Sequence, residues 1–585
     1  MWQQNYTPLS GSLALSALVA SLPIFVLLYL IGIARKPAWV AAVCGLAGAI
    51  VVALGVYGMP SGLMINAVLY GGAFGLFPIG WIVYWAIVLY RITVETGNFE
   101  VIKDSVGGLT DDRRLQALLI AFALGAFIEG AAGFGTPVAV AAAMLTGLGF
   151  SPFYAAAICL VANTAPVAFG SIGIPVVTLA GITGLPMDQL SAWVGRICAP
   201  VSLFIPAYLV MVMGGWRALS GVLPAAILCG VAFAGTQYYV SNYIGPQLTD
   251  ILSALAAILA LVILFKVWRP SDHFELEGAK PAAKPHRHDL TATLRAWAPY
   301  LFLVFFVLMW GNDNPVAALR ILTAFAAFFL YLMAANVSPG AARIAAIAGA
   351  VAFIAVWFLE PAFGIKDWAN RFTIKFPWPG LHGMIERMPP VAATASPYAA
   401  EYTFNWLAAS GTACLLASIF AMITLRMSVG KYVSILTAAA RQLFLSMVTI
   451  ASVLGLAFLM NYCGATATLG LAFAATGVAF PFFSAMLGWL GVFLTGSDTS
   501  ANALFGNLQV VTANRLGLDP ILMASANSAG GVMGKMISLQ SIAVAAAATG
   551  MPPSDEAKLF RFTTRHSIFL ASVLGIITFI YSSAR

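Results

Sequence analysis

Uninterrupted apolar segments long enough to cross a lipid bilayer recur along the whole chain, from Leu13 to Tyr581. Because the hydrocarbon core offers no water to the backbone, only α-helices and closed β-barrels can span it. The segments are continuous rather than alternating, which favours helices. Hydrophobic residues make up 61% of the chain and charged residues only 9%, whereas a soluble domain has about 25% charged residues. The sequence therefore predicts an all-α polytopic membrane protein.

Composition also argues against several other classes. The N-terminus has no basic region before its first apolar run, so we expect residues 13–33 to be a retained helix and not a signal peptide. The six cysteines are scattered, and the five histidines lie in loops or at a helix edge without ligand spacing, so we expect no disulfide framework, no metal and no cofactor. Basic helix ends explain the net charge of +8, and we expect no nucleic-acid partner.

Lysine and arginine gather in a few connections between the apolar segments. The three richest loops run from Arg91 to Arg114, from Lys266 to Arg295 and from Arg426 to Arg441. Because cytoplasmic connections carry an excess of basic residues, we expect all three on the cytoplasmic side. Shorter basic clusters follow the same pattern: Arg35 with Lys36, Arg217, Arg343, and Lys558 to Arg565. A longer segment rich in proline and aromatic residues, 360–403, is expected outside.

This assignment predicts about 14 spanning helices and puts both termini outside. The expected spans are 13–33, 38–58, 62–94, 153–183, 191–213, 217–239, 247–267, 296–311, 316–335, 342–359, 404–426, 442–460, 520–549 and 564–582.

Three further apolar segments, 115–149, 466–480 and 482–513, are not expected to cross fully. The first and the last have the pattern of re-entrant helical hairpins, in which a tip rich in Gly, Ser and Thr joins two arms too short to span. Irregular backbone at membrane depth is tolerated only where it is buried in protein or lines a cavity. We therefore expect function at the two tips.

The two halves of the chain repeat one set of features. Phe127-Ile-Glu-Gly130 matches Phe493-Leu-Thr-Gly496, and Ala162-Asn-Thr-Ala165 matches Ala526-Asn-Ser-Ala529 at nearly the same spacing. The predicted topology places the two hairpins on opposite sides, so the sequence predicts two inverted structural repeats, the pattern of transporters with a central site. Close helix packing is the alternative explanation for the small residues.

We accordingly divide the chain into three parts. Residues 1–270 form a first membrane repeat with a cytoplasmic-side hairpin (115–149) and a broken helix (153–183). Residues 271–295 form a cytoplasmic linker. Residues 296–585 form a second repeat with an outer loop (360–403), an outer-side hairpin (482–513) and a broken helix (520–549).

Three ionisable residues fall inside the repeated features: Glu129 at the first tip, Asp498 at the second, and Lys535 in the second broken helix. Each costs about 2.5 to 3.5 kcal/mol at a helix centre on an insertion scale, so each must be paired, hydrated or functional. A structural ion pair is the alternative. We expect Glu129 and Asp498 to carry a coupling proton, with His566 as the next candidate.

Uncharged polar residues surround these charges. We expect a substrate site formed by Lys535, Asn163, Thr164, Asn527, Ser528, Ser497 and Thr499, and hairpin tips formed by Gly130, Gly133, Gly135, Thr136, Thr495, Gly496, Ser500 and Asn502. Each hydroxyl or amide could equally satisfy freed backbone groups.

Several motifs resemble those of the bacterial L-lactate permeases. They are Glu129-Gly-Ala-Ala-Gly-Phe-Gly-Thr-Pro137, Asn163-Thr-Ala-Pro-Val-Ala-Phe-Gly170, Gly491-Val-Phe-Leu-Thr-Gly-Ser-Asp-Thr-Ser500 and Gly534-Lys-Met-Ile-Ser538. The resemblance runs nearly end to end and implies a proton symporter for L-lactate, D-lactate and glycolate in the cytoplasmic membrane. Leu539 departs from the proline that this family pattern leads us to expect after Ser538, which affects local geometry.

Other functions fit less well. A membrane-embedded enzyme would need a clustered nucleophile or metal set, and a channel would need a repeated filter or charged ring. The sequence shows neither of these patterns. A sodium-coupled dicarboxylate transporter on a similar fold is the closest alternative. The sequence leaves the oligomeric state open, and a homodimer is compatible with it.

Overall fold

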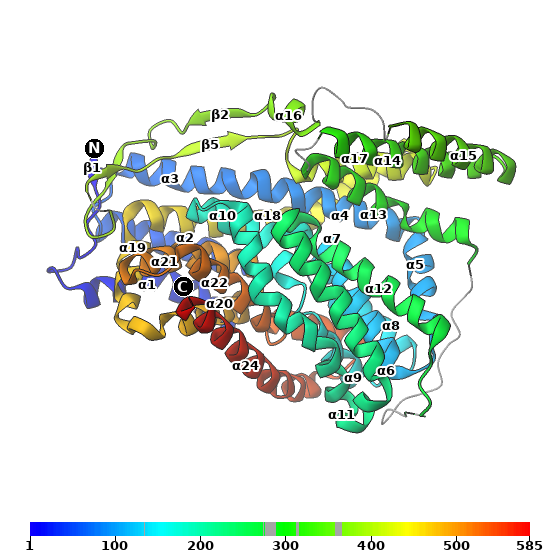
Figure 1. Ribbon diagram of the computed structural model, residues 1–585. Coiled ribbons are helices and arrows are strands. Elements are labelled where there is room, and N and C mark those ends of the chain that lie inside the picture. The colour runs from blue at the N-terminus through cyan, green and yellow to red at the C-terminus, as the bar shows by residue number, and fades with distance from the viewer. Residues whose placement is uncertain are drawn as a thin grey trace.

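The computed structural model describes residues 1–34, 36–133, 135–272, 274, 288–311, 315–356, 365–392 and 394–584. The chain is built almost entirely of helices (Figure 1). Those of the first half are α1 (Leu13–Gly32), α2 (Ala38–Gly55), α3 (Ser61–Phe74), η1 (Gly75–Gly80), α4 (Trp81–Glu95), α5 (Asn98–Gly107), α6 (Arg113–Gln116), η2 (Ala117–Leu124), α7 (Gly125–Ala131), α8 (Thr136–Gly147), α9 (Pro152–Ala162), η3 (Val167–Phe169), α10 (Gly170–Thr183), α11 (Met187–Tyr243), η4 (Pro246–Leu248) and α12 (Thr249–Val267).

The second half continues the helical pattern and adds short strands. Its helices are α13 (Leu290–Gly311), α14 (Pro315–Ala335), α15 (Pro339–Val356), α16 (Ile365–Asn370), α17 (Ser410–Thr424), α18 (Val429–Cys463), α19 (Ala465–Phe473), η5 (Ala474–Ala479), α20 (Phe480–Thr495), α21 (Asp498–Leu516), α22 (Pro520–Lys535), α23 (Leu539–Thr549) and α24 (Pro553–Ser583). The strands are β1 (Trp2–Gln3), β2 (Ile374–Pro377), β3 (Ile385–Arg387), β4 (Ser396–Pro397) and β5 (Glu401–Phe404).

Among the described residues, 13 helical stretches are long and apolar enough to cross a membrane, or 14 if the bent pair α9–α10 counts as one span. This confirms the predicted polytopic helical fold. Most predicted spans coincide with one of these stretches, and the break at Gly214–Gly215 divides α11 where a turn between two spans was expected. The inverted repeat and the re-entrant course of the hairpins stay predictions.

Four boundaries differ from the prediction. Residues 466–480, expected not to cross, continue into the first arm of the second hairpin as one stretch, Ala465–Thr495, that is long enough to span. The first hairpin arm is one helical stretch from Arg113 to Ala131, long enough to cross, because η2 continues α6 into α7 without a break. Helix α17 has 15 residues, shorter than the expected span 404–426. The basic segment from Arg426 to Arg441, expected as a loop, is mostly helical because the Ser428 hydroxyl caps α18 by accepting a hydrogen bond from the Lys431 amide at 3.3 Å.

The basic segments meet on one side of the molecule. Lys431 Nζ donates to the Glu95 carbonyl at 2.7 Å, and Arg114 pairs with Asp272 at 2.7 Å. His288 Nε2 lies 2.9 Å from Asp104 Oδ2. The predicted linker 271–295 therefore begins and ends against the first basic segment, while its residues 273 and 275–287 lie outside the described residues.

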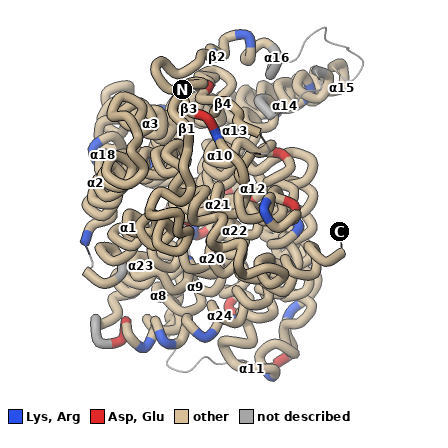
Figure 2. Tube along the Cα trace, turned by 90° about the vertical axis from the view of Figure 1, so that its left-hand side faces the viewer, with Lys and Arg blue, Asp and Glu red and all other residues tan. Residues whose placement is uncertain are grey.

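Strand β1 lies at the other end of the molecule from α5, and β2 and β5 run from there along one edge towards α16 (Figure 1). Strand β1 pairs in parallel with β3, which pairs with β4, and β2 pairs with β5 in antiparallel register. Figure 2 shows β1, β3 and β4 gathered on the face where the chain begins. The buried Gln4 side chain extends this contact into the helices, donating to the carbonyls of Asn461 and Tyr462 at 2.9 and 2.8 Å. The N-terminus thus fastens the predicted outer loop to α18.

Both long helices that follow the hairpins are interrupted. The axes of α9 and α10 differ by 63°, and Ser171, Ile172 and Gly173 all have left-handed backbone with φ of 47°, 61° and 75°. Such a conformation costs of order 1 to 3 kcal/mol for a non-glycine residue. Helix α22 ends at Lys535, and the Ser538 side chain caps the start of α23.

Candidate functional site

A cavity of about 150 Å³ lies where the two hairpin tips and the interrupted helices meet. It is lined by the predicted site residues Glu129, Thr495, Gly496, Ser497, Asp498, Thr499, Ser500 and Lys535. An apolar cavity of about this size holds a benzene-sized molecule. The charged and hydroxyl-bearing wall here suits a small polar molecule instead.

The second tip is a tight turn between α20 and α21. Gly496 ends α20 with φ of 72°, and the Ser497 side chain caps α21 by accepting from the Ser500 amide at 3.3 Å. The Thr495 hydroxyl donates back to the Gly491 carbonyl at 2.7 Å. This geometry turns the amino end of α21 towards the cavity, where its partial positive charge favours an anion.

Asp498 occupies the first turn of α21 and is 3% exposed. The Ser528 hydroxyl donates to its Oδ2 at 2.7 Å, and Asn502 Nδ2 reaches the same oxygen at 3.4 Å. Within the described part of the chain, Oδ1 has no hydrogen-bond partner. Helix α22 approaches this oxygen closely, since a Cβ atom added to Gly531 would lie 2.2 Å from it. One carboxylate oxygen is therefore held, and the other is left without a donor.

A buried amide network supports Asp498 from behind. Asn527 Nδ2 donates to Asn502 Oδ1 at 2.9 Å, and Gln509 Nε2 donates to Asn527 Oδ1 at 3.0 Å. Asn502 also donates to the Pro175 carbonyl in α10 at 3.1 Å. The network links α21 and α22 to the broken helix of the first half. Asn502, Asn527 and Ser528, which the sequence singled out, hold Asp498 in place and do not line the cavity.

Lys535 lies in the last turn of α22 and is 8% exposed. Its Nζ donates to the Gly496 carbonyl at 2.7 Å. It also attracts both Glu129 and Asp498 electrostatically. The cation therefore shares the cavity with both carboxylates and forms a salt bridge with neither of them.

Glu129 reaches the cavity from the last turn of α7. Its side chain is 4% exposed, and Oε2 finds no hydrogen-bond donor among the described residues. Helix α10 packs directly against it, since a Cβ on Gly170 would lie 2.7 Å from Oε1. Asn163 lies beside Glu129 but does not line the cavity, and the Thr164 hydroxyl donates to the Val161 carbonyl at 2.8 Å.

The glycines of the first tip serve packing. Gly130 faces α12, Gly133 faces Ser171, and Gly135 precedes α8 with φ of 83°. The Ser171 hydroxyl donates to the Ala132 carbonyl at 3.0 Å, which ties the tip to α10. Gly130, Gly133, Gly135 and the part-buried Thr136 do not line the cavity.

Several lining residues were missed from the sequence. Ser171 follows a motif that was recognised, but Ser446 and Thr449 sit in α18, outside the repeated features, and Gln540 follows the break after α22. A serine or threonine hydroxyl within a helix does not by itself indicate a binding site in the sequence. Asp250, buried next to the first tip at the start of α12, was also missed.

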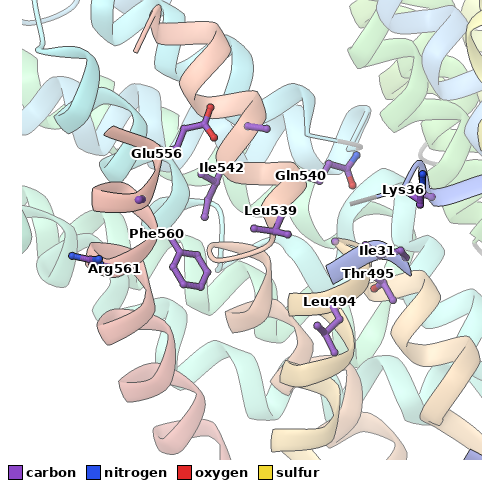
Figure 3. A pocket seen from close by; sticks show the side chains of 14 residues that line it. Ile31, Lys36, Leu494, Thr495, Leu539, Gln540, Ile542, Glu556, Phe560 and Arg561 are labelled. Atoms are coloured by element: carbon purple, nitrogen blue, oxygen red, sulfur yellow. The ribbon is translucent and has the colours of Figure 1, made fainter. Parts of the chain in front are cut away.

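A second cavity of about 850 Å³ adjoins the first and shares Ala38, Thr495, Gly496 and Gln540 with it. Figure 3 shows Gln540, Thr495 and Lys36 on one wall and Phe560 on the facing helix α24. Lys36 and Arg561, which both line this cavity, belong to basic clusters predicted on the cytoplasmic side. The second cavity thus lies next to the small one and is lined by residues of the basic helix ends.

The comparisons with known proteins agree with the resemblance in the sequence. Residues 16–583 match the L-lactate permease family. The chain is 43% identical to an L-lactate permease of Bacillus subtilis, covering 99% of this chain and 98% of that protein. It is 41% identical to an L-lactate permease of Escherichia coli, covering 99% and 98%, and 41% identical to the glycolate permease GlcA of the same bacterium, covering 99% and 97%. The chain belongs to the L-lactate permease family of multi-pass inner-membrane proteins.

Proposed function

We propose that this permease carries L-lactate, D-lactate and glycolate across the inner membrane together with a proton. The observation that carries the proposal is the cavity of about 150 Å³ that Lys535 lines together with Glu129 and Asp498, both of which it attracts. Lactate has as many non-hydrogen atoms as benzene, which a cavity of this size can hold. The names of the relatives, lactate and glycolate permeases, support the same substrate class.

The carboxylate of the substrate binds at the amino end of α21 and beside Lys535. Both favour an anion, the helix end through its dipole and the ammonium through its full charge. The substrate hydroxyl bonds with Ser497, Thr499 or Ser500, whose side chains line the cavity. A second carboxylate, as in a dicarboxylate, would face Glu129 and Asp498 and be repelled.

The proton compensates the charge that the substrate brings. Without substrate, Lys535 faces two acidic groups; when the anion binds the lysine, one carboxylate loses its counter-charge. Uptake of one proton by Asp498 or Glu129 restores the charge of the substrate-free site, so lactate and proton together move no net charge against the membrane potential, which would cost about 2.3 kcal/mol per charge per 100 mV.

Transport by purified protein in liposomes tests the proposal. We expect counterflow of labelled lactate, which only a carrier gives, and accumulation driven by an imposed pH gradient. Glycolate and D-lactate should compete, whereas succinate should not. Accumulation that follows a sodium gradient and not a pH gradient, or competition by dicarboxylates, would favour the sodium-coupled alternative.

A further inference from the structure

Asp250 is a buried carboxyl group that has no role in the transport cycle proposed above. It lies in the first turn of α12 and is 1% exposed. Neither Oδ1 nor Oδ2 has a hydrogen-bond partner in the part of the chain that the structure describes. An ionised carboxylate in such a place loses its hydration without compensation, at a cost of several kcal/mol.

Helix α12 places Asp250 directly against the first hairpin tip. A Cβ atom added to Gly130 would lie 2.8 Å from the Asp250 Cβ and 3.1 Å from the Ile251 amide nitrogen. Gly130 follows Glu129, and the two carboxyl groups interact electrostatically. Because Gly130 has no side chain, the backbone next to Glu129 can pack directly against the Asp250 side chain.

The titratable groups that face Asp250 include no cation. Of the elements packed against α12, helix α7 contributes Glu129 and α11 contributes Cys198, whose thiol also interacts with Asp498. The neighbouring η2, η4 and α10 contain no titratable residue. Lys535 acts on Glu129 and Asp498. Among the described residues around Asp250, no basic side chain neutralises its carboxyl group.

Two carboxyl groups with unpartnered oxygens thus belong to the first tip and the helix packed against it, and they interact electrostatically: Asp250, with both oxygens, and Glu129, with Oε2. We propose that Asp250 carries a proton in the substrate-free protein and donates a hydrogen bond to Glu129 Oε2, the oxygen that has no other donor. Asp250 is then a positioning residue: it keeps its proton throughout, stabilises the ionised form of Glu129, and so sets how readily Glu129 releases the coupling proton. This inference rests on the proposed proton coupling and on Glu129 taking part in it.

The pH dependence of lactate accumulation in liposomes tests this role. Asp250→Asn keeps a neutral donor and should leave the midpoint of the pH profile where the wild type has it. Asp250→Leu removes the donor, so Glu129 holds its proton more tightly and the midpoint should rise by about one pH unit, a tenfold change in proton affinity. Asp188→Asn and Asp188→Leu are matched controls, since Asp188 is an exposed acid in the first turn of α11.

Two outcomes would overturn the inference. One is an unshifted midpoint in Asp250→Leu, which would show that Asp250 has no influence on Glu129. The other is loss of pH-driven accumulation in Asp250→Asn, which would show that the ionised form of Asp250 is needed.

A second measurement does not depend on transport and applies even if the leucine variant fails to fold. The infrared spectrum of substrate-free wild-type protein at neutral pH should contain a carbonyl band of a protonated carboxyl group that is absent from Asp250→Asn. Identical spectra would overturn the inference. If the band is present but wild-type uptake ignores a pH gradient, the proposed coupling fails while the protonation of Asp250 stands.

Discussion

Lys535 donates a hydrogen bond from its Nζ to the carbonyl oxygen of Gly496 at 2.7 Å. The bond fixes the end of the interrupted helix α22 to the tip between α20 and α21. Because a backbone carbonyl is a neutral partner, the charge of the lysine stays available to an anion in the cavity. The same bond makes the shape of the tip depend on the lysine.

Replacing Lys535 by methionine keeps most of the side-chain volume and removes the charge. A hydrogen bond to a charged group contributes about 1.5 to 3 kcal/mol, so we expect the KM for lactate to rise at least about tenfold. Uptake kinetics in liposomes measure this. Lys431→Met, the same change at a surface lysine that binds the Glu95 carbonyl, is the control. An unchanged KM in Lys535→Met would make Lys535 a structural residue.

Neutral amides at the two cavity carboxylates should separate coupling from exchange. We expect Asp498→Asn and Glu129→Gln to lose pH-driven accumulation, since an amide does not take up the proton, while lactate exchange between equal pools partly survives. The loss should be greater at position 498, because the Ser528 hydroxyl and Asn502 already hold that side chain. Wild-type accumulation by both variants would move the coupling proton elsewhere, with His566 as the next residue to test.

Gly531 permits the contact between α22 and Asp498. Alanine there would place its Cβ 2.2 Å from Asp498 Oδ1, and relieving such overlap in a packed core typically costs about 1 to 3 kcal/mol. We expect Gly531→Ala to lower the thermal unfolding temperature and to raise the KM for lactate. Gly430→Ala, at a helical glycine with open space around it, should change neither. Normal transport by Gly531→Ala would mean that Asp498 can turn aside without loss.

Labelling from each side of the membrane tests the predicted topology. A tag inserted between residues 271 and 290 should be reachable only from the cytoplasm. A cysteine in place of the half-exposed Met384, next to β3, should react only from outside. Reaction of both sites from one side would overturn the alternation of spans and the inverted repeat with it.

The fold and the charged centre of the site could be predicted because both rest on strong local signals. Apolar length marks spanning helices, and an ionised residue such as Lys535 within an apolar segment is rare enough to stand out. Helix ends were less predictable. Ser428 begins α18 before the basic residues that had been interpreted as a loop, because a cap is a local hydrogen bond and not a change in hydropathy.

The supporting residues depended on tertiary contacts that no local pattern reveals. Asp250 lies near the edge of a predicted span, where an acid is ordinarily hydrated, and the packing of neighbouring helices, α7 and α11 among them, against α12 buries it. Ser446 and Thr449 lie in a helix with no repeated counterpart. Asn527 was recognised, but as a substrate ligand, whereas Gln509 and Asn502 bind it within the protein.

The parallel pairing of β1 with β3 joins Trp2 to Ile385 and Gln3 to Glu386. This pairing constrains the order in which parts of the protein assemble during synthesis. Trp2 and Gln3 have no strand partner until the segment around Ile385 has been synthesised and moved to the same face. At about 5 to 20 residues per second, translation alone delays that pairing by some tens of seconds. Trp2 and Gln3 therefore stay unpaired while most of the membrane helices insert. The hydrogen bonds from Gln4 to the carbonyls of Asn461 and Tyr462 accordingly form late in assembly.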